Sequence, residues 1–149
     1  MIDTQLAFLA LNISVLPLWL LLIVAPQWRW THRLVHRIWL PGLLCVLWGG
    51  ILLLMPPLPE GAGVASLAQF MVFMTSPAGA LLVWLQLLMW DLFVGAWVAR
   101  DALRRRLHHG LVAPSLVLVL LLPPLGLLVY FGVRSLRTGV TSLWEAPSW

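Results

Sequence analysis

The sequence predicts an all-α membrane protein, a polytopic bundle of four transmembrane helices with one short interfacial or re-entrant helix. Of its 149 residues, 62% are hydrophobic and only 9% are charged, and the mean hydropathy of +0.98 is far above that of soluble globular chains. The apolar residues form long runs separated by short arginine-bearing loops. We therefore expect residues 1–149 to form a single transmembrane domain.

The first two spans are predicted at residues 6–25 and 38–55. Polar residues and one proline interrupt the first span, which membrane helices tolerate where neighbouring groups satisfy the backbone. The second span ends at the proline-rich segment 56–59, which cannot continue a helix. This segment is expected to be a turn outside the membrane.

Residues 64–75 are apolar but too short to span a bilayer, so they predict the interfacial or re-entrant helix. The third span is predicted at residues 79–99, where one long apolar run ends in a basic segment. The fourth is predicted at residues 111–133. Because Pro123 and Pro124 lie near its middle, we expect this fourth helix to be kinked.

The arginines predict the orientation of these spans. All of them except Arg134 and Arg137 lie in the loop between the first two spans or in the loop between the last two. The positive-inside rule makes these loops cytoplasmic, so both termini are expected to be non-cytoplasmic. In this topology Arg134 and Arg137 lie on the opposite side from the other arginines.

Composition also excludes several classes of function. The basic residues flank apolar runs instead of a soluble face with stacking aromatics, so no nucleic acid is expected as a partner, whereas membrane lipid is. The single cysteine, Cys45, excludes an intrachain disulfide and a cysteine-based metal site. The histidine pairs His32/His36 and His108/His109 stand among arginines that repel cations, so no metal is expected. No phosphate-binding loop or nucleophile elbow is present, and no cofactor is expected.

Asp91 is the most unusual residue, because it is an acid in the middle of the third predicted span. It lies about 14 Å along the helix from Arg100, close to the midplane of a hydrocarbon core about 30 Å thick. A charged side chain there costs about 2.5 to 3.5 kcal/mol even on a lenient insertion scale. Asp91 is therefore expected to face a bundle interior, a cavity or a reaction site.

Large flat side chains surround Asp91 on two adjacent stripes of this helix. One interpretation is a slot for an elongated apolar ligand, with aromatic walls and one ionisable group. The ligand-binding residues expected for this slot are Gln86, Trp84, Trp90, Phe93, Gly95 and Trp97.

A structural interpretation of the same residues is also open. Asp91 would then be protonated, or hydrogen-bonded across to another helix at Asn12, Ser14 or a free backbone carbonyl, while the aromatic rings only pack. Asp101, at the membrane edge, has Arg104 and Arg105 at the spacing of a helix-surface ion pair, and for this acid the structural interpretation is favoured.

Three stretches of the chain carry a family resemblance. Residues 84–101 are WLQLLMWDLFVGAWVARD and residues 123–134 are PPLGLLVYFGVR, and the end of the first span, LPLWLLLIVAP at residues 16–26, fits as well. The chain resembles the abscisic-acid-deficiency family, small integral membrane proteins that include neoxanthin synthase of plants. The most specific element is the D-L-F-x-G-x-W-x-x-x-D core that runs from Asp91 to Asp101.

The resemblance implies a reaction as well as a fold. In the plant members the epoxide end group of violaxanthin becomes the allene of neoxanthin, so the resemblance implies an isomerase that acts on a carotenoid or another isoprenoid lipid. Asp91 and Asp101 would be its catalytic acid–base residues. Gln86 departs from the pattern, because the family usually has histidine there and glutamine cannot shuttle a proton near pH 7.

A non-catalytic alternative stays open beside the enzyme. The chain would then be a pigment- or lipid-binding subunit, or an assembly subunit of a membrane complex, with Asp91 as an interhelical hydrogen bonder. A carotenoid or isoprenoid ligand is the expected partner in either case, and a homo-oligomer is a further expectation. The compact sequence, which has no transit-peptide pattern, favours a bacterial inner membrane.

Overall fold

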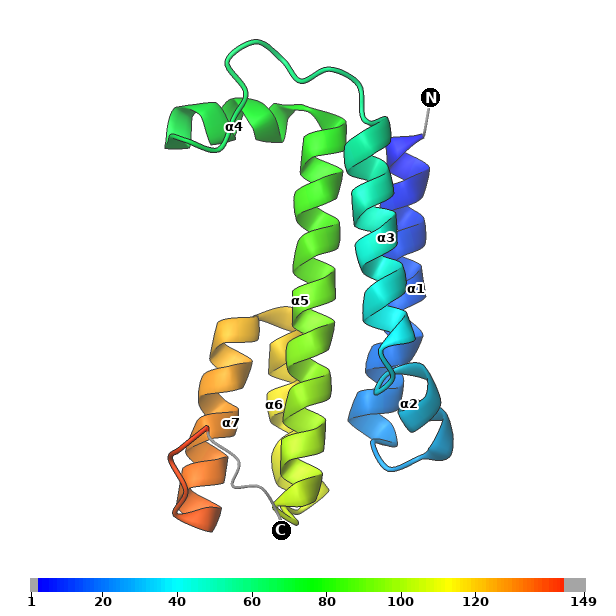
Figure 1. The fold of residues 1–149 in the computed structure, drawn as a ribbon. Helices are drawn as coiled ribbons and strands as arrows, with labels where there is room; N and C mark the ends of the chain where they lie inside the picture. Colours follow the sequence, from blue (N-terminus) through cyan, green and yellow to red (C-terminus); the bar gives the residue numbers. More distant parts are fainter. Residues whose placement is uncertain (1–2, 144–149) are drawn as a thin grey trace.

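The computed structural model describes residues 3–143, and within this range the secondary structure is helical throughout (Figure 1). The helices in chain order are α1 (Thr4–Val24), α2 (Arg29–Leu34), α3 (Trp39–Leu54), α4 (Leu67–Thr75), α5 (Pro77–Arg104), α6 (His109–Leu121) and α7 (Pro123–Thr138). The all-α prediction is confirmed for the described residues.

Two of these helices, α1 and α5, are long and apolar enough to cross a membrane. A third apolar helix, α3, has 16 residues and is shorter than a usual membrane span. In Figure 1 the axes of all three lie side by side and nearly aligned, with α3 running opposite to α1 and α5. The first three predicted spans are therefore helices at the expected positions, and the length and composition of α1 and α5 support a membrane protein.

Helices α1 and α5 run parallel and touch at two levels. The rings of Phe8 and Trp84 lie 5.3 Å apart between centroids. Further along, the Trp19 ring packs so closely on Gly95 that a Cβ there would lie 2.5 Å from the ring. These contacts are about three helical turns apart on both helices, so one face of α5 packs against α1. Trp19, Leu22 and Leu85 are fully buried in this core.

The short helix α4 lies across the end of α5 in Figure 1. Ser66 begins it by accepting a hydrogen bond from the Gln69 amide at 3.2 Å, and Ser76 then caps α5, whose first residue is Pro77. Proline suits this first position because no intrahelical partner is lost there. The prediction of a short helix within residues 64–75 is confirmed.

The prediction of a single fourth span at residues 111–133 is wrong. The chain leaves the helical conformation at Leu122, with φ −145° and ψ 78°, and α6 and α7 form an antiparallel hairpin (Figure 1). Pro123 favours this non-helical conformation of Leu122, because a residue before proline is disfavoured in the helical region. Gly126 lets α7 pack directly on α6, since a Cβ there would lie 2.6 Å from the Val119 Cα. The four-span bundle is therefore not supported.

The hairpin gathers the arginines at one end of the molecule. It returns the chain to the end where α2 lies and where α5 ends, so the last turns of α7 lie there too (Figure 1). Arg134 and Arg137 thus join the other arginines instead of opposing them. The prediction that both termini are non-cytoplasmic concerns residues 1–2 and 144–149, which lie outside the described range; α1 begins and α7 ends at opposite ends of the molecule.

Candidate functional site

Asp91 lies on the face of α5 that packs against α1. It stands one helical turn before Gly95 and two turns after Trp84, and both of these residues contact α1. The two contacts share the same offset in sequence, which places the buried Val15 of α1 level with Asp91. The carboxyl is partly buried. It is therefore an acid in the middle of an apolar helix, turned toward a neighbouring helix.

The Asp91 carboxylate has no hydrogen bond or ion pair within residues 3–143. The side chains that could reach across from α1 are engaged elsewhere: the Asn12 amide donates to the Phe8 carbonyl at 2.8 Å and the Ser14 hydroxyl to the Leu11 carbonyl at 2.9 Å. Both bonds stay inside α1. Within residues 3–143 the structure thus shows a half-buried carboxyl without the interhelical hydrogen bond that was one of the two structural interpretations of Asp91.

The predicted ligand-binding residues lie on different faces of α5. Phe93 and Trp97 together line a cavity of about 270 Å³ against α7, and Asp91 is not among its lining residues. Trp84 and Gly95 lie on its face of α5, against α1. Trp90 and Phe93 are about half exposed, pack edge to face on each other, and lie with the exposed Gln86 on the outer side of the helix. Trp97 packs instead on α7, against Tyr130 and Phe131.

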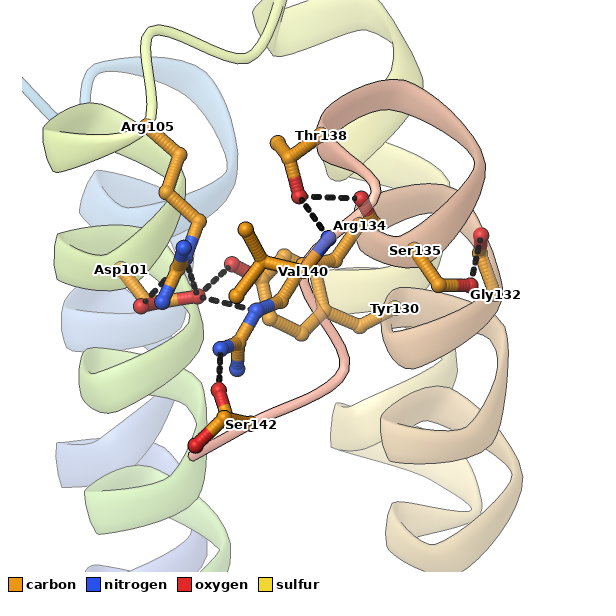
Figure 2. Close-up of polar contacts among 9 residues, drawn as sticks. All are labelled: Asp101, Arg105, Tyr130, Gly132, Arg134, Ser135, Thr138, Val140 and Ser142. Atoms are coloured by element: carbon orange, nitrogen blue, oxygen red, sulfur yellow. Dashed lines mark hydrogen bonds and ion pairs between the residues drawn. The ribbon is translucent and has the colours of Figure 1, made fainter. Parts of the chain in front are cut away.

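Asp101 is the centre of a buried ionic cluster (Figure 2). Its carboxylate accepts from Arg105 Nε at 3.0 Å on each oxygen and from the Tyr130 hydroxyl at 2.5 Å, and it lies 3.5 Å from Arg134 Nε. Asp101 and Arg134 are each 2% exposed and Tyr130 is fully buried. The carboxylate of Asp101 is thus engaged on both oxygens, which favours the ion-pair interpretation, with Arg105 at i+4 as its partner on α5.

Tyr130 and Arg134 are residues that the sequence reasoning missed. They stand one turn apart on α7 and both reach Asp101, so the cluster fastens α7 to α5 (Figure 2). Arg134 also donates to the Ser142 carbonyl, which holds the chain after α7. The sequence does show that Tyr130 and Arg134 stand at i, i+4 and so share one helix face. Only the α6–α7 hairpin, however, places that face against Asp101.

In the part of the chain that the structure describes, the histidines have different surroundings. No group of three or more His, Cys, Asp or Glu side chains lies close enough there to hold an ion. His109 Nε2 lies 2.7 Å from the Ile23 carbonyl, and His108 Nδ1 accepts from the Gly110 amide. His108 therefore stabilises the start of α6, whereas His109 links α6 to α1.

The family model for ABA DEFICIENT 4-like proteins matches residues 6–130. This chain belongs to the ABA DEFICIENT 4-like family. No curated protein and no solved structure matches it. The match covers α1 through the middle of α7. It includes both acids of the D-L-F-x-G-x-W-x-x-x-D core, Asp91 and Asp101, and also Tyr130, whose hydroxyl donates to Asp101. Arg134 lies beyond it.

Proposed function

We propose that this ABA DEFICIENT 4-like protein is a membrane isomerase that acts on a carotenoid or another isoprenoid lipid, with Asp91 as its acid–base residue. The observation that carries the proposal is the Asp91 carboxylate, which is half-buried in the middle of the longest apolar helix and has no partner within residues 3–143. A charge at such a depth without a partner is typical of a functional site.

The contrast with Asp101 supports this assignment. Asp101 is fully engaged by Arg105, Tyr130 and Arg134, as a carboxylate with a structural role should be. Asp91 sits only ten positions earlier on the same helix, and neither Asn12 nor Ser14 serves it. The two acids of the family core thus have different environments: the Asp101 carboxylate is engaged by three side chains, and the Asp91 carboxylate by none of the described residues.

The chemistry needs one proton to move. In the conversion of an epoxide end group into an allene, a base removes a proton from the polyene carbon next to the ring, and the C–H electrons form the new C=C bond. The epoxide C–O bond breaks, its electron pair stays on oxygen, and the oxygen takes a proton. A carboxyl can accept the first proton and return one to the oxygen, so no redox partner is required.

The decisive test is the turnover of an epoxy-carotenoid by Asp91→Asn. The protein is reconstituted in liposomes that contain violaxanthin, and the product is followed by chromatography and absorption. We expect the rate to fall by about 10²- to 10⁴-fold, because asparagine cannot exchange the proton. Folding and membrane insertion should be unchanged.

Glu60→Gln is the matched control, since it makes the same change of charge in the exposed loop after α3. It should keep wild-type turnover. Equal turnover in Asp91→Asn and wild type would reject Asp91 as the acid–base residue. If the wild-type protein holds the carotenoid but leaves it unchanged, the non-catalytic pigment-binding function replaces the enzyme.

The proposed orientation places the arginine-rich end in the cytoplasm. The positive-inside rule favours this orientation. The α6–α7 hairpin places Arg134 and Arg137 at the same end as the other arginines, so they no longer oppose it. Asp91 would then lie between this end and the outer end, at which α4 lies.

A further inference from the structure

A groove lies between the first half of α3 and the second half of α5. Its cavity volume is about 230 Å³. This is below the usual range of about 300 to 1,000 Å³ for small-molecule pockets, so it fits a segment of a chain and not a whole pigment. Its apolar walls are formed by Leu40, Leu44, Met89, Leu92, Phe93 and Ala96.

One end of this groove is basic and has no counter-ion among residues 3–143. His36, Arg37 and Arg100 line it. Arg100 Nε and both ring nitrogens of His36 are buried without a hydrogen-bond partner in the described chain. The neighbouring acid, Asp101, is already engaged by Arg105 and Arg134.

The surroundings of His36 change its ionisation. Burial of the imidazole, together with the nearby positive charges of Arg100 and His32, lowers its pKa to about 4. His36 is therefore neutral at pH 7, with one donor and one acceptor. An anion bound at this end would supply the missing partner for both Arg100 and His36.

We propose that this groove is a binding site for an anionic phospholipid, with the phosphate at Arg37 and Arg100 and a segment of one acyl chain along the apolar walls. The guanidinium fork matches phosphate geometry, and basic pockets between helices at the cytoplasmic side of a membrane bind anionic headgroups. Ile38 and Phe93 on the walls are 89% and 49% exposed, so the groove continues into the outer apolar surface. The rest of the lipid would therefore stay in the bilayer.

The test is native mass spectrometry of the full chain, titrated with phosphatidylglycerol in mild detergent. We expect one tightly bound lipid, and Arg100→Gln should weaken its binding about tenfold, because one charge-assisted contact to the phosphate is lost. Arg37→Gln, at an exposed position, should weaken binding in the same direction without endangering the fold. Ala96→Phe should fill the groove and reduce binding by chain exclusion.

Arg137→Gln is the control, because it removes an exposed arginine at the same end of the molecule but outside the groove. Its lipid binding should stay within about twofold of wild type. Phosphatidylcholine of the same chain length that binds as tightly as phosphatidylglycerol would overturn the proposal. Displacement by millimolar inorganic phosphate would assign the basic end to free phosphate instead, and wild-type binding in both Arg37→Gln and Arg100→Gln would reject the site.

The groove and Asp91 are tested separately. Asp91 does not line the groove, so Asp91→Asn should retain the bound phosphatidylglycerol even where it abolishes turnover.

Discussion

The two acids of α5 show how an identical side chain takes two roles through its surroundings. Asp101 has two arginines and a tyrosine on its carboxylate and is closed to the exterior, whereas Asp91 has no partner within the described residues. Sequence spacing predicted the Arg105 contact, because i, i+4 pairs face each other on any helix. It could not predict Tyr130 and Arg134, which come from another helix.

Removal of single groups from the Asp101 cluster should measure its contribution to stability. Tyr130→Phe deletes one hydrogen bond to a charged acceptor and should lower the free energy of unfolding by about 1.5 to 3 kcal/mol. Asp101→Asn should cost more, about 3 to 5 kcal/mol, because it leaves the buried Arg134 without its counter-ion.

Denaturation in mild detergent checks both values. Ser135→Ala is the control, since among the described residues the Ser135 hydroxyl bonds within α7, to the Gly132 carbonyl, and its loss should change little. If Tyr130→Phe were as stable as wild type, the cluster would not fasten α7 to α5.

The α6–α7 hairpin is the element that the sequence could not distinguish from a kinked span. Two prolines inside an apolar run are compatible with a kink, since membrane helices bend at proline without reversing. The reversal depends on the non-helical backbone of Leu122 and on the close packing of Gly126 on Val119, and the sequence alone does not show that this packing occurs. The positions of Arg134 and Arg137 were the only warning in the sequence, because a single span sets them against the other arginines.

Gly126→Val should separate the two helices of the hairpin. The added side chain meets the Val119 backbone, and overpacking of this kind costs about 1 to 3 kcal/mol. Gly132→Ala on the same helix is a matched control, because nothing lies within 4 Å of its added Cβ and alanine favours the helix. Thermal unfolding should therefore shift down for Gly126→Val and stay level or rise for Gly132→Ala. A Gly126→Val protein as stable as wild type would contradict the close approach.

For the whole molecule, the apolar runs predicted the helices well and their connectivity in space less well. Hydropathy located α1, α3 and α5, and the length of residues 64–75 located α4, because these properties are local. The path of the last third of the chain depends on contacts between helices, and so does the neighbouring helix that each face of α5 meets. All the residues predicted to form a slot around Asp91 lie on one helix, α5. A binding site also needs residues from neighbouring helices, and the sequence does not say which helices lie beside α5.

The α6–α7 hairpin and a single fourth span predict different sides of the membrane for the chain after α7. In a Cys45→Ser background, single cysteines are introduced at three exposed positions: Gln27→Cys before α2, Glu60→Cys in the loop after α3, and Thr141→Cys after α7. A membrane-impermeant maleimide, applied to sealed vesicles of known orientation, reports which side each thiol faces. Because α7 returns to the arginine-rich end, Gln27→Cys and Thr141→Cys should be labelled from one side and Glu60→Cys from the other. Labelling of Thr141→Cys together with Glu60→Cys would mean that residues 111–133 do cross the membrane, and would place Arg134 and Arg137 against the positive-inside rule.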